Sequence, residues 1–405
     1  MRASTRIEAL DVLRAFALFG IIVTHSMMSY LAGRPADPEF NIFSSLDSTT
    51  MELGFLFANG KFFSIFSFLF GVSFAIQLDR AIAKGSGFNG RFAWRLMLLL
   101  VIGFIHNLFF SGDILTVYAL LGFLLIPLQR VGTKPLFVLG LLLVFNVPGI
   151  VSGLVHFNAP PPTAQEQQLM AQSQAQDMET SKQQFDIKQN GSLAQVVHMN
   201  LAQGFADKLW FQIASGRLFI TFGCFLLGLC AWRTRIFADS PQDRALIQRV
   251  ALWTGVVAAV TSMIAWIFPP GMMLMAPSEL WPYINGCVQQ VTLAAFYFSA
   301  VLSIYWRCNA TSWIHQLGPM GKMGLTSYLT QSVFGVLVFY GFGLGLLGRI
   351  GVATGLALGV AFFICQIFIA RWWMQRFSQG PIEWLWRSAT DRKLQPFLRP
   401  EVAAA

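Results

Sequence analysis

Long apolar runs recur along the whole chain and are separated by mostly short polar connections. A helix needs roughly 20 mostly apolar residues to cross the hydrocarbon core of a bilayer. Runs of about this length predict membrane-spanning helices near residues 8–31, 53–77, 93–110, 114–129, 135–155, 209–232, 249–268, 282–306, 323–347 and 352–373. We therefore expect an all-α protein, a polytopic transmembrane helix bundle of about ten helices.

The composition supports the same fold class. Of the 405 residues, 55% are hydrophobic and only 12% are charged, whereas about 25% is usual for soluble domains. A chain with half the usual charge exposes most of its surface to something other than water, so a lipid bilayer is the first expected partner. The first apolar run contains Asp11 and Arg14 but is long enough to span, and we interpret it as a retained helix rather than a cleaved signal peptide.

The Lys and Arg residues are distributed unevenly between the two sets of connections. Twenty lie at the termini and in alternate connections, and only five lie in the others, namely Arg34, Lys182, Lys188, Lys208 and Arg349. Because cytoplasmic loops carry an excess of Lys and Arg, both termini are expected in the cytoplasm. This distribution also accounts for the net charge of +9, so nucleic-acid binding is not expected.

One connection is much longer than the others. It begins with Pro160, Pro161 and Pro162 and continues through a Gln-rich stretch of mixed charge. We expect it outside the cytoplasm, as either a solvated, loosely helical cap or a substrate-binding lid. The chain then divides into an N-terminal membrane half (1–155), this extracytoplasmic loop (156–208), a C-terminal membrane half (209–376) and a cytoplasmic tail (377–405).

The cytoplasmic tail carries a Trp-Leu-Trp-Arg sequence at residues 384–387. Alternating Trp, Leu and Arg predict a short helix that lies in the membrane interface. Glu383 and Arg387 would then either belong to a membrane anchor or contribute to a cytoplasmic ligand site.

Titratable side chains within membrane helices are costly, so each is a candidate functional residue. On the first helix these are Asp11, Arg14 and His25. Arg14 and His25 are eleven positions apart, which places both side chains near one helix face. Asp11 and Arg14 are three positions apart and can pair. Their alternative role is a structural ion pair, and the alternative for His25 is a hydrogen-bonded histidine of the core.

Five ionisable groups from five different runs fall at similar depths in the outer half of the predicted bundle: His25, Lys61, His106, Asp113 and Arg217. A carboxylate next to a histidine orients the imidazole and raises its basicity. His106 and Asp113 flank one tight turn and are expected to meet in this way. Taken singly, Lys61 and Arg217 could instead extend to the outer interface.

No metal site is predicted. The spacing of His25, His106 and Asp113 gives no specific support for one. The five cysteines form neither a CxxC pair nor a Cys/His cluster, so we interpret them as small apolar residues of the bundle.

Five segments resemble the YeiB-like bacterial membrane proteins, a domain-of-unknown-function family numbered 418. They are residues 10–21 (LDVLRAFALFGI), residues 61–71 (KFFSIFSFLFG), His106 with GDIL at 112–115, residues 324–332 (GLTSYLTQS) and residues 380–387 (GPIEWLWR). The resemblance covers nearly the whole chain apart from the loop 156–208. It implies a multi-pass protein of the bacterial cytoplasmic (inner) membrane.

This family is similar to membrane acyltransferases, including the type-3 acyltransferases and the heparan-glucosaminide acetyltransferase. The type-3 group has an Arg, ten residues and then a His on its first helix, and Arg14 and His25 have this spacing. YeiB-like proteins commonly have Asn at the second position, so His25 departs from the closer family and agrees with the more distant one. The resemblance implies a possible membrane-bound O-acyltransferase, with acyl-CoA as a co-substrate and no bound cofactor.

The hypothesis is an acyl transfer across the membrane. The donor would enter from the cytoplasm near Arg14, and an extracytoplasmic glycan or lipid hydroxyl would accept the acyl group. His25 or His106 would act as a base or carry the acyl group. Asp113 would orient His106.

Further residues complete this site. Lys61 or Arg217 would stabilise the developing oxyanion. The candidate substrate-binding residues are Asp11, Lys61, Tyr118, Arg217, Gln331, Glu383 and Arg387.

The alternative hypothesis is a transporter or lipid flippase that uses the same charged residues as a proton or substrate path. The two halves of the chain show no convincing repeat, which favours the enzyme. The oligomeric state is left open.

Overall fold

A computed structural model describes residues 2–30, 44–85, 87–158, 160, 163–271, 274 and 276–399. Arg34, Pro161, Pro162, the last residue of the first predicted run and the end of the predicted tail lie outside the described residues.

The described residues are almost entirely helical, and their single strand-like feature is an isolated bridge between Phe377 and Leu398. The all-α class is therefore confirmed. The N-terminal half contains α1 (Arg2–Thr24), a π-helical turn (His25–Ser29), α2 (Ser44–Phe57), α3 (Lys61–Ala83), α4 (Asn89–Phe109), α5 (Leu115–Leu128), α6 (Thr133–Val144) and α7 (Val147–Phe157).

The rest of the chain is built in the same way. The long connection forms α8 (Ala164–Asn190), α9 (Leu193–Met199), a second π-helical turn (Asn200–Gly204) and α10 (Phe205–Ala214). The C-terminal half contains α11 (Arg217–Arg233), α12 (Pro241–Ile267), α13 (Leu280–Arg307), α14 (Gly318–Lys322), α15 (Gly324–Phe339), α16 (Val352–Arg376) and α17 (Pro381–Asp391). Short 3₁₀ turns cover Pro277–Glu279 and His315–Leu317.

Six segments among the described residues are long and apolar enough to cross a membrane: Glu8–Met28, Ser45–Ala83, Asn89–Phe109, Pro241–Ile267, Pro277–Arg307 and Val352–Arg376. Two bent helix pairs, α6 with α7 and the helices of Leu193–Ala214 with α11, raise the number to eight if each pair is one span. The helices α5 and α15 are apolar but shorter. The predicted ten crossings and the cytoplasmic position of both termini stay predictions.

Three predicted runs differ from the structure. The runs 135–155 and 209–232 are not continuous helices, because bends of 52° and 71° interrupt them. Asn146 and Gly216, at these breaks, have left-handed backbone conformations with φ of 51° and 71°, which end a right-handed helix. The run 323–347 is helical only as far as Phe339. The glycine-rich segment after it turns back, with left-handed Gly345 and Gly348.

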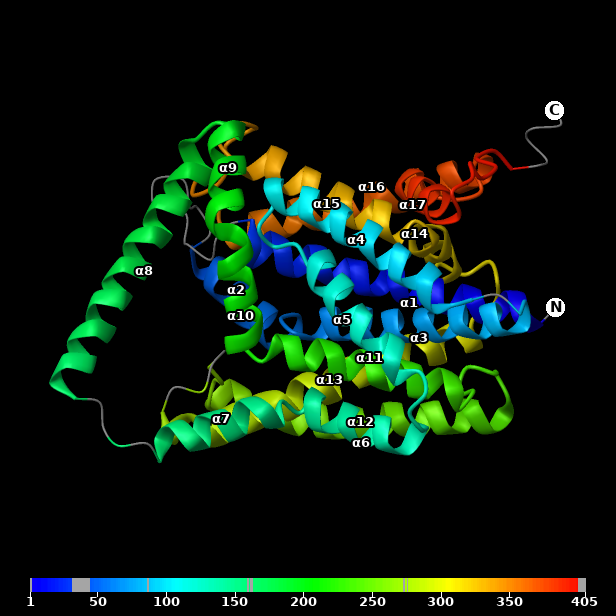
Figure 1. The fold of residues 1–405 in the computed structure, drawn as a ribbon, viewed down its shortest axis with the longest axis horizontal. Coiled ribbons are helices and arrows are strands. Elements are labelled where there is room, and N and C mark those ends of the chain that lie inside the picture. Colours follow the sequence, from blue (N-terminus) through cyan, green and yellow to red (C-terminus); the bar gives the residue numbers. More distant parts are fainter. Residues whose placement is uncertain are drawn as a thin grey trace.

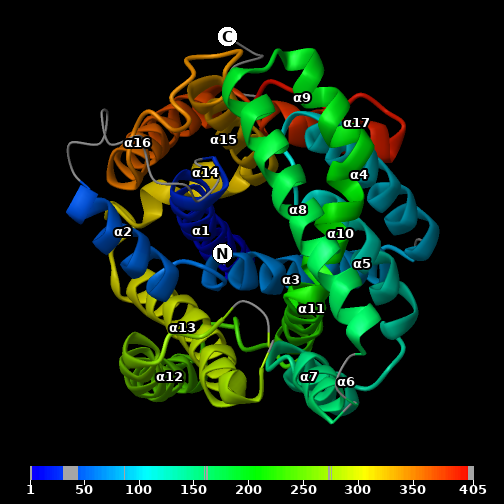
Figure 2. The same cartoon turned by 90° about the vertical axis from the view of Figure 1, so that its left-hand side faces the viewer.

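The helix α1 forms the centre of the bundle, with the other membrane helices around it (Figure 2). Most of its described apolar residues are buried, and Leu13 and Leu18 are fully buried. Both ends of the chain lie at one end of the bundle, and α8 crosses the opposite end (Figure 1). This arrangement agrees with an even number of crossings.

Two glycines allow α3 and α11 to pack closely. A Cβ atom added to Gly71 would lie 2.0 Å from the carbonyl oxygen of Phe225, and one added to Gly228 would lie 2.1 Å from that of Phe68. Backbone atoms cannot rotate away as a side chain can, so any larger residue must push the helices apart.

We expect Gly71→Ala to destabilise the protein by about 1–3 kcal/mol, the usual cost of overpacking a core. Gly90→Ala is the matched control, because nothing lies within 4 Å of a Cβ atom at that helical position. Alanine has the higher helix propensity, so the control should be neutral or slightly stabilising. Thermal unfolding of both variants in detergent measures the difference, and equal midpoints would contradict the close packing of α3 and α11.

Candidate functional site

A cavity of about 660 Å³ extends into the bundle from the end at which the chain termini lie. It begins among exposed residues at the ends of α3 and α4, including Lys84 and Arg91. Its walls come from α1, α3, α4, α14, α15 and α17, and it reaches Leu115, Tyr118 and Tyr328 inside the bundle. Helices from both halves of the chain therefore build this one site.

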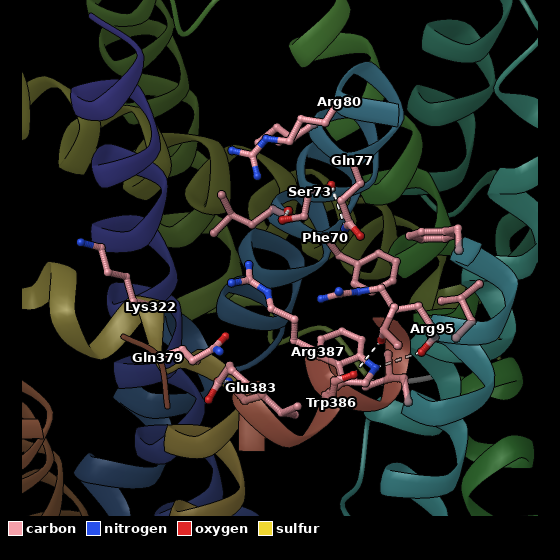
Figure 3. A pocket seen from close by; sticks show the side chains of 18 of the residues that line it. Phe70, Ser73, Gln77, Arg80, Arg95, Lys322, Gln379, Glu383, Trp386 and Arg387 are labelled. Atoms are coloured by element: carbon pink, nitrogen blue, oxygen red, sulfur yellow. Dashed lines mark hydrogen bonds between the residues drawn. The ribbon is translucent and has the colours of Figure 1, made fainter. Parts of the chain in front are cut away.

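The cavity is strongly basic. Its cationic residues are Arg14, Arg80, Lys84, Arg91, Arg95, Lys322 and Arg387, and its acidic residues are Asp11, Glu383 and Asp391. Figure 3 shows Arg80 from α3 and Arg387 from α17 extending from different walls into the same space, with Lys322 from α14 to one side. An excess of positive charge in a recess attracts an anionic ligand and raises its local concentration.

Some of these charges hold the fold, and others are free to bind a ligand. Arg14 pairs with Asp11 and donates to the Ser73 hydroxyl at 2.8 Å. Arg91 pairs with Asp391. By contrast, Arg80, Lys322 and Arg387 form no ion pair with any described residue. Together with Lys84 at the mouth, which also forms no ion pair with a described residue, these are the cations that the cavity presents to a ligand.

The tail helix α17 forms one wall of the cavity, and its position in the membrane interface stays a prediction. Its Trp386 indole donates to the Arg95 carbonyl at 3.1 Å, and the Arg95 guanidinium lies 3.8 Å from the Trp386 ring centre. Of the two roles considered for Glu383 and Arg387, this position favours the ligand site.

Glu383 joins α17 to the start of α15. Its carboxylate accepts hydrogen bonds from the backbone N–H groups of Leu325 and Thr326, at 2.6 and 3.0 Å, and from the Thr326 hydroxyl at 2.5 Å. It therefore caps α15 from another part of the chain. Burial raises the pKa of Glu383, although these hydrogen bonds oppose the shift.

His106 and Asp113 form a dyad beyond the inner end of the cavity. The His106 Nδ1 atom lies 2.9 Å from Asp113 Oδ1, and both residues are buried. An ionised carboxylate only accepts, so Nδ1 carries the proton and Nε2 is left as an acceptor. Nε2 is buried and has no hydrogen-bond partner within the described part of the chain. In the neutral imidazole, this arrangement leaves Nε2 as the atom that can act as a base.

Asp113 has further partners that fix its position. Its Oδ2 atom accepts from Lys208 Nζ at 3.2 Å and from the Thr116 hydroxyl at 2.7 Å. The Leu115 and Thr116 N–H groups, at the start of α5, also donate to this carboxylate. Lys208 Nζ also contacts Asn107 Oδ1 at 2.8 Å. The dyad is thereby held by α4, α5 and α10.

His25 lies near this dyad. It begins the π-helical turn that follows α1, and such turns are rare and frequent at functional sites. The rings of Phe110 and Tyr328 each pack against both histidines: their centres lie 5.2 and 6.4 Å from that of His25, and 5.8 and 5.3 Å from that of His106. His25 Nδ1 is buried and unpaired among the described residues.

Tyr328 connects the cavity to the histidines. It lines the inner end of the cavity and packs against both imidazoles. Its hydroxyl accepts a long hydrogen bond, 3.3 Å, from the N–H of Ile114, next to Asp113. The basic cavity and the dyad are therefore adjoining parts of one site.

The other candidate residues lie in three places. Tyr118 lines the cavity and bonds to Ser67 at 2.6 Å. Gln331 is buried away from the cavity, where it donates to Gln366 at 3.1 Å. Lys61 and Arg217 lie at the far end of α3 from Arg80, at the starts of α3 and α11.

Sequence reasoning missed Lys208, Tyr328, Arg80 and Lys322 as site residues. Lys208 was counted only among the charges of the outer loop, and Arg80 and Lys322 were counted only among the charges of the inner connections. Tyr328 belongs to the segment 324–332 that carries the family resemblance, which was the one available signal. Among the described residues, no group of three or more His, Cys, Asp or Glu side chains is arranged to hold a metal ion.

Glu383→Gln tests the capping contact through its pH dependence. A raised pKa favours the protonated carboxyl in the folded state, so its contribution to stability is complete below the unfolded pKa of about 4.3 and is lost as the pH rises through the folded value. Wild type should lose stability relative to Glu383→Gln as the pH rises above about 4. Thermal unfolding in detergent measures this difference, with the exposed Glu52→Gln as control. The opposite trend would show that the hydrogen bonds outweigh burial.

Comparison with known proteins supports the family expectation. Residues 231–393 match a family described as "Protein of unknown function (DUF418)". The chain is 30% identical to the uncharacterized protein YxaH of Bacillus subtilis (strain 168), over 97% of this chain and 96% of that protein. It is 25% identical to the uncharacterized protein YeiB of Escherichia coli (strain K12), over 96% of this chain and 97% of that protein. The resemblance seen in the sequence is thus confirmed, and the chain belongs to the YeiB-like DUF418 family.

Proposed function

We propose that this protein is a membrane-bound O-acyltransferase of the bacterial inner membrane. It would move an acyl group from cytoplasmic acyl-CoA to a hydroxyl of an extracytoplasmic glycan or lipid. The observation that carries this proposal is the position of Tyr328, which ends a basic cavity and packs against the His106 of a His–Asp dyad. The cavity that would bind a polyanionic donor thus adjoins the residue that would act as the general base.

The outer part of the cavity suits the phosphates of coenzyme A. Arg80, Lys322 and Arg387 offer unpaired cations there, and Arg presents donors in a geometry that matches phosphate. The inner part is lined by apolar residues, including Phe66, Leu69 and Leu99, which suit an acyl chain. The charge asymmetry of the connections, which predicts the cytoplasm at this end, supports a cytoplasmic donor.

The chemical step would use His106 as a general base. Its Nε2 would take the proton of the acceptor hydroxyl as the oxygen attacks the thioester carbonyl carbon. The C–O bond forms, the C–S bond breaks, and the coenzyme A thiolate takes the proton from the imidazolium. Asp113 would hold the Nδ1–H tautomer and stabilise the imidazolium. His25 packs against the same two rings as His106, those of Phe110 and Tyr328. It would orient the acceptor hydroxyl through its Nδ1 atom, which has no partner among the described residues.

The test uses purified protein in liposomes with radiolabelled acetyl-CoA, measuring release of free coenzyme A and transfer of label. His106→Gln and Asp113→Asn should each lower the rate by about 10²–10⁴-fold, the usual contribution of general base catalysis. His156→Gln is the matched control, because His156 is exposed on α7. Arg387→Gln should raise the acetyl-CoA concentration needed for half-maximal rate more than it lowers the maximal rate.

Thermal shift with acetyl-CoA and longer acyl-CoAs separates a wrong donor from a wrong function. If no acyl-CoA stabilises the folded protein and none is consumed, the acyltransferase proposal is wrong. Solute movement in the same vesicles that depended on His106 would then favour the transporter.

A further inference from the structure

Lys61 and Arg217 occupy equivalent places in two different helices. Lys61 is the first residue of α3, and Arg217 is the first residue of α11. Each follows a glycine in the left-handed conformation, Gly60 with φ of 86° and Gly216 with φ of 71°. Each cation is therefore the first residue of a helix, Arg217 after a bend of 71° and Lys61 within the longer apolar segment Ser45–Ala83.

These two helix starts lie side by side. Arg217 donates to Asn59 Oδ1 at 2.8 Å, just before α3, and Trp232, near the end of α11, donates to Asp79 at 2.7 Å, near the end of α3. The helices α3 and α11 therefore run parallel, and the close contacts at Gly71 and Gly228 hold them together. The N-terminus of a helix carries a partial positive charge. The two helix starts therefore add to the positive electrostatic potential that Lys61 and Arg217 produce.

Neither cation has a carboxylate partner in the part of the chain that the structure describes. The Lys61 side chain is only 4% exposed, and its ammonium has one long contact, 3.4 Å, to the Phe55 carbonyl. The Arg217 guanidinium lies between the Phe63 and Phe211 rings, with centres 5.4 and 5.0 Å away. Charges buried without counter-charges are costly, and a bound anion would compensate them.

The position of this cluster relates it to the candidate active site. Phe62, the residue after Lys61, packs against Gly20 of α1, five positions before His25: a Cβ atom added to Gly20 would lie 1.8 Å from the Phe62 ring. Lys61 and Arg80 are separated by nineteen residues of α3, which is about 28 Å along the helix axis. The cation cluster thus lies near the histidines, at the end of α3 opposite the basic cavity.

We infer that Lys61 and Arg217 form an anion site that holds a phosphate-type group of the acceptor. The helix starts supply oriented N–H groups, and the side chains supply two charges. The acceptor would then be an anionic lipid or glycolipid that carries a phosphate near its reactive hydroxyl. The acceptor identity rests on the proposed acyltransferase function, whereas the anion site itself does not.

Binding is measured without any acyl-CoA, so that it is independent of activity. The full-length protein is placed in phosphatidylcholine nanodiscs with or without phosphatidylglycerol, and separately titrated with inorganic phosphate, using thermal unfolding and native mass spectrometry. Wild type should bind phosphatidylglycerol, and Lys61→Gln and Arg217→Gln should each weaken that binding at least tenfold. Arg349→Gln, which removes an exposed cation, should bind like wild type, and Arg217→Lys should retain part of the binding.

The two arms identify the source of the phosphate. Binding of phosphatidylglycerol alone supports a lipid ligand, and binding of inorganic phosphate as well supports a site for the phosphate group itself. The anion site would be overturned if wild type bound neither phosphatidylglycerol nor inorganic phosphate. It would also be overturned if the folded Lys61→Gln and Arg217→Gln variants bound these ligands like wild type. Anion binding that persists when no acyl-CoA is consumed would leave the site intact and reject only the acyltransferase.

Discussion

The carboxylate of Asp113 is the group on which the inner organisation of the bundle depends. It is only 1% exposed, and an isolated charge there would be far too costly. Donors from His106, Lys208 and Thr116 surround it, so one ion ties α4, α5 and α10 together. The same contacts begin α5 and fix the His106 tautomer. Stability and candidate chemistry therefore depend on one charge.

Long helices then set the spacing between the parts of the site. The helix α4 carries Arg95 at the cavity and His106 at the dyad, which are eleven residues and about 16 Å apart along its axis. The segment of α1 and its π-helical turn similarly carries Arg14 at the cavity and His25 near the dyad. Because a helix is stiff, the distance between the basic cavity and the histidines is fixed by residue number along single elements. Such elements can hold a donor and an acceptor at opposite sides of a membrane.

Much of this fold could be predicted from the sequence, because apolar length alone decides which segments suit a bilayer. The breaks could not, since the helix break at Asn146 needs a left-handed backbone that its neighbours impose. In the site, His106 and Asp113 could be paired in advance because one tight turn separates them. Lys208 could not, because it reaches Asp113 from a position 95 residues away, on a helix that bends sharply into α11. Long-range packing, which no local pattern encodes, decides such contacts.

The charges of the bundle interior fall into two classes with different consequences. Those with partners, such as Arg14 with Ser73 or Glu383 with Thr326, join helices and contribute to stability. Those without counter-charges among the described residues lie in two places: the exposed Arg80, Lys322 and Arg387 line the basic cavity, and the buried Lys61 lies at the opposite end of α3. A protein gains nothing in stability from an uncompensated charge away from water. Under the proposed function, an anionic ligand would compensate the buried charge of Lys61, and the exposed Arg80, Lys322 and Arg387 would bind the donor.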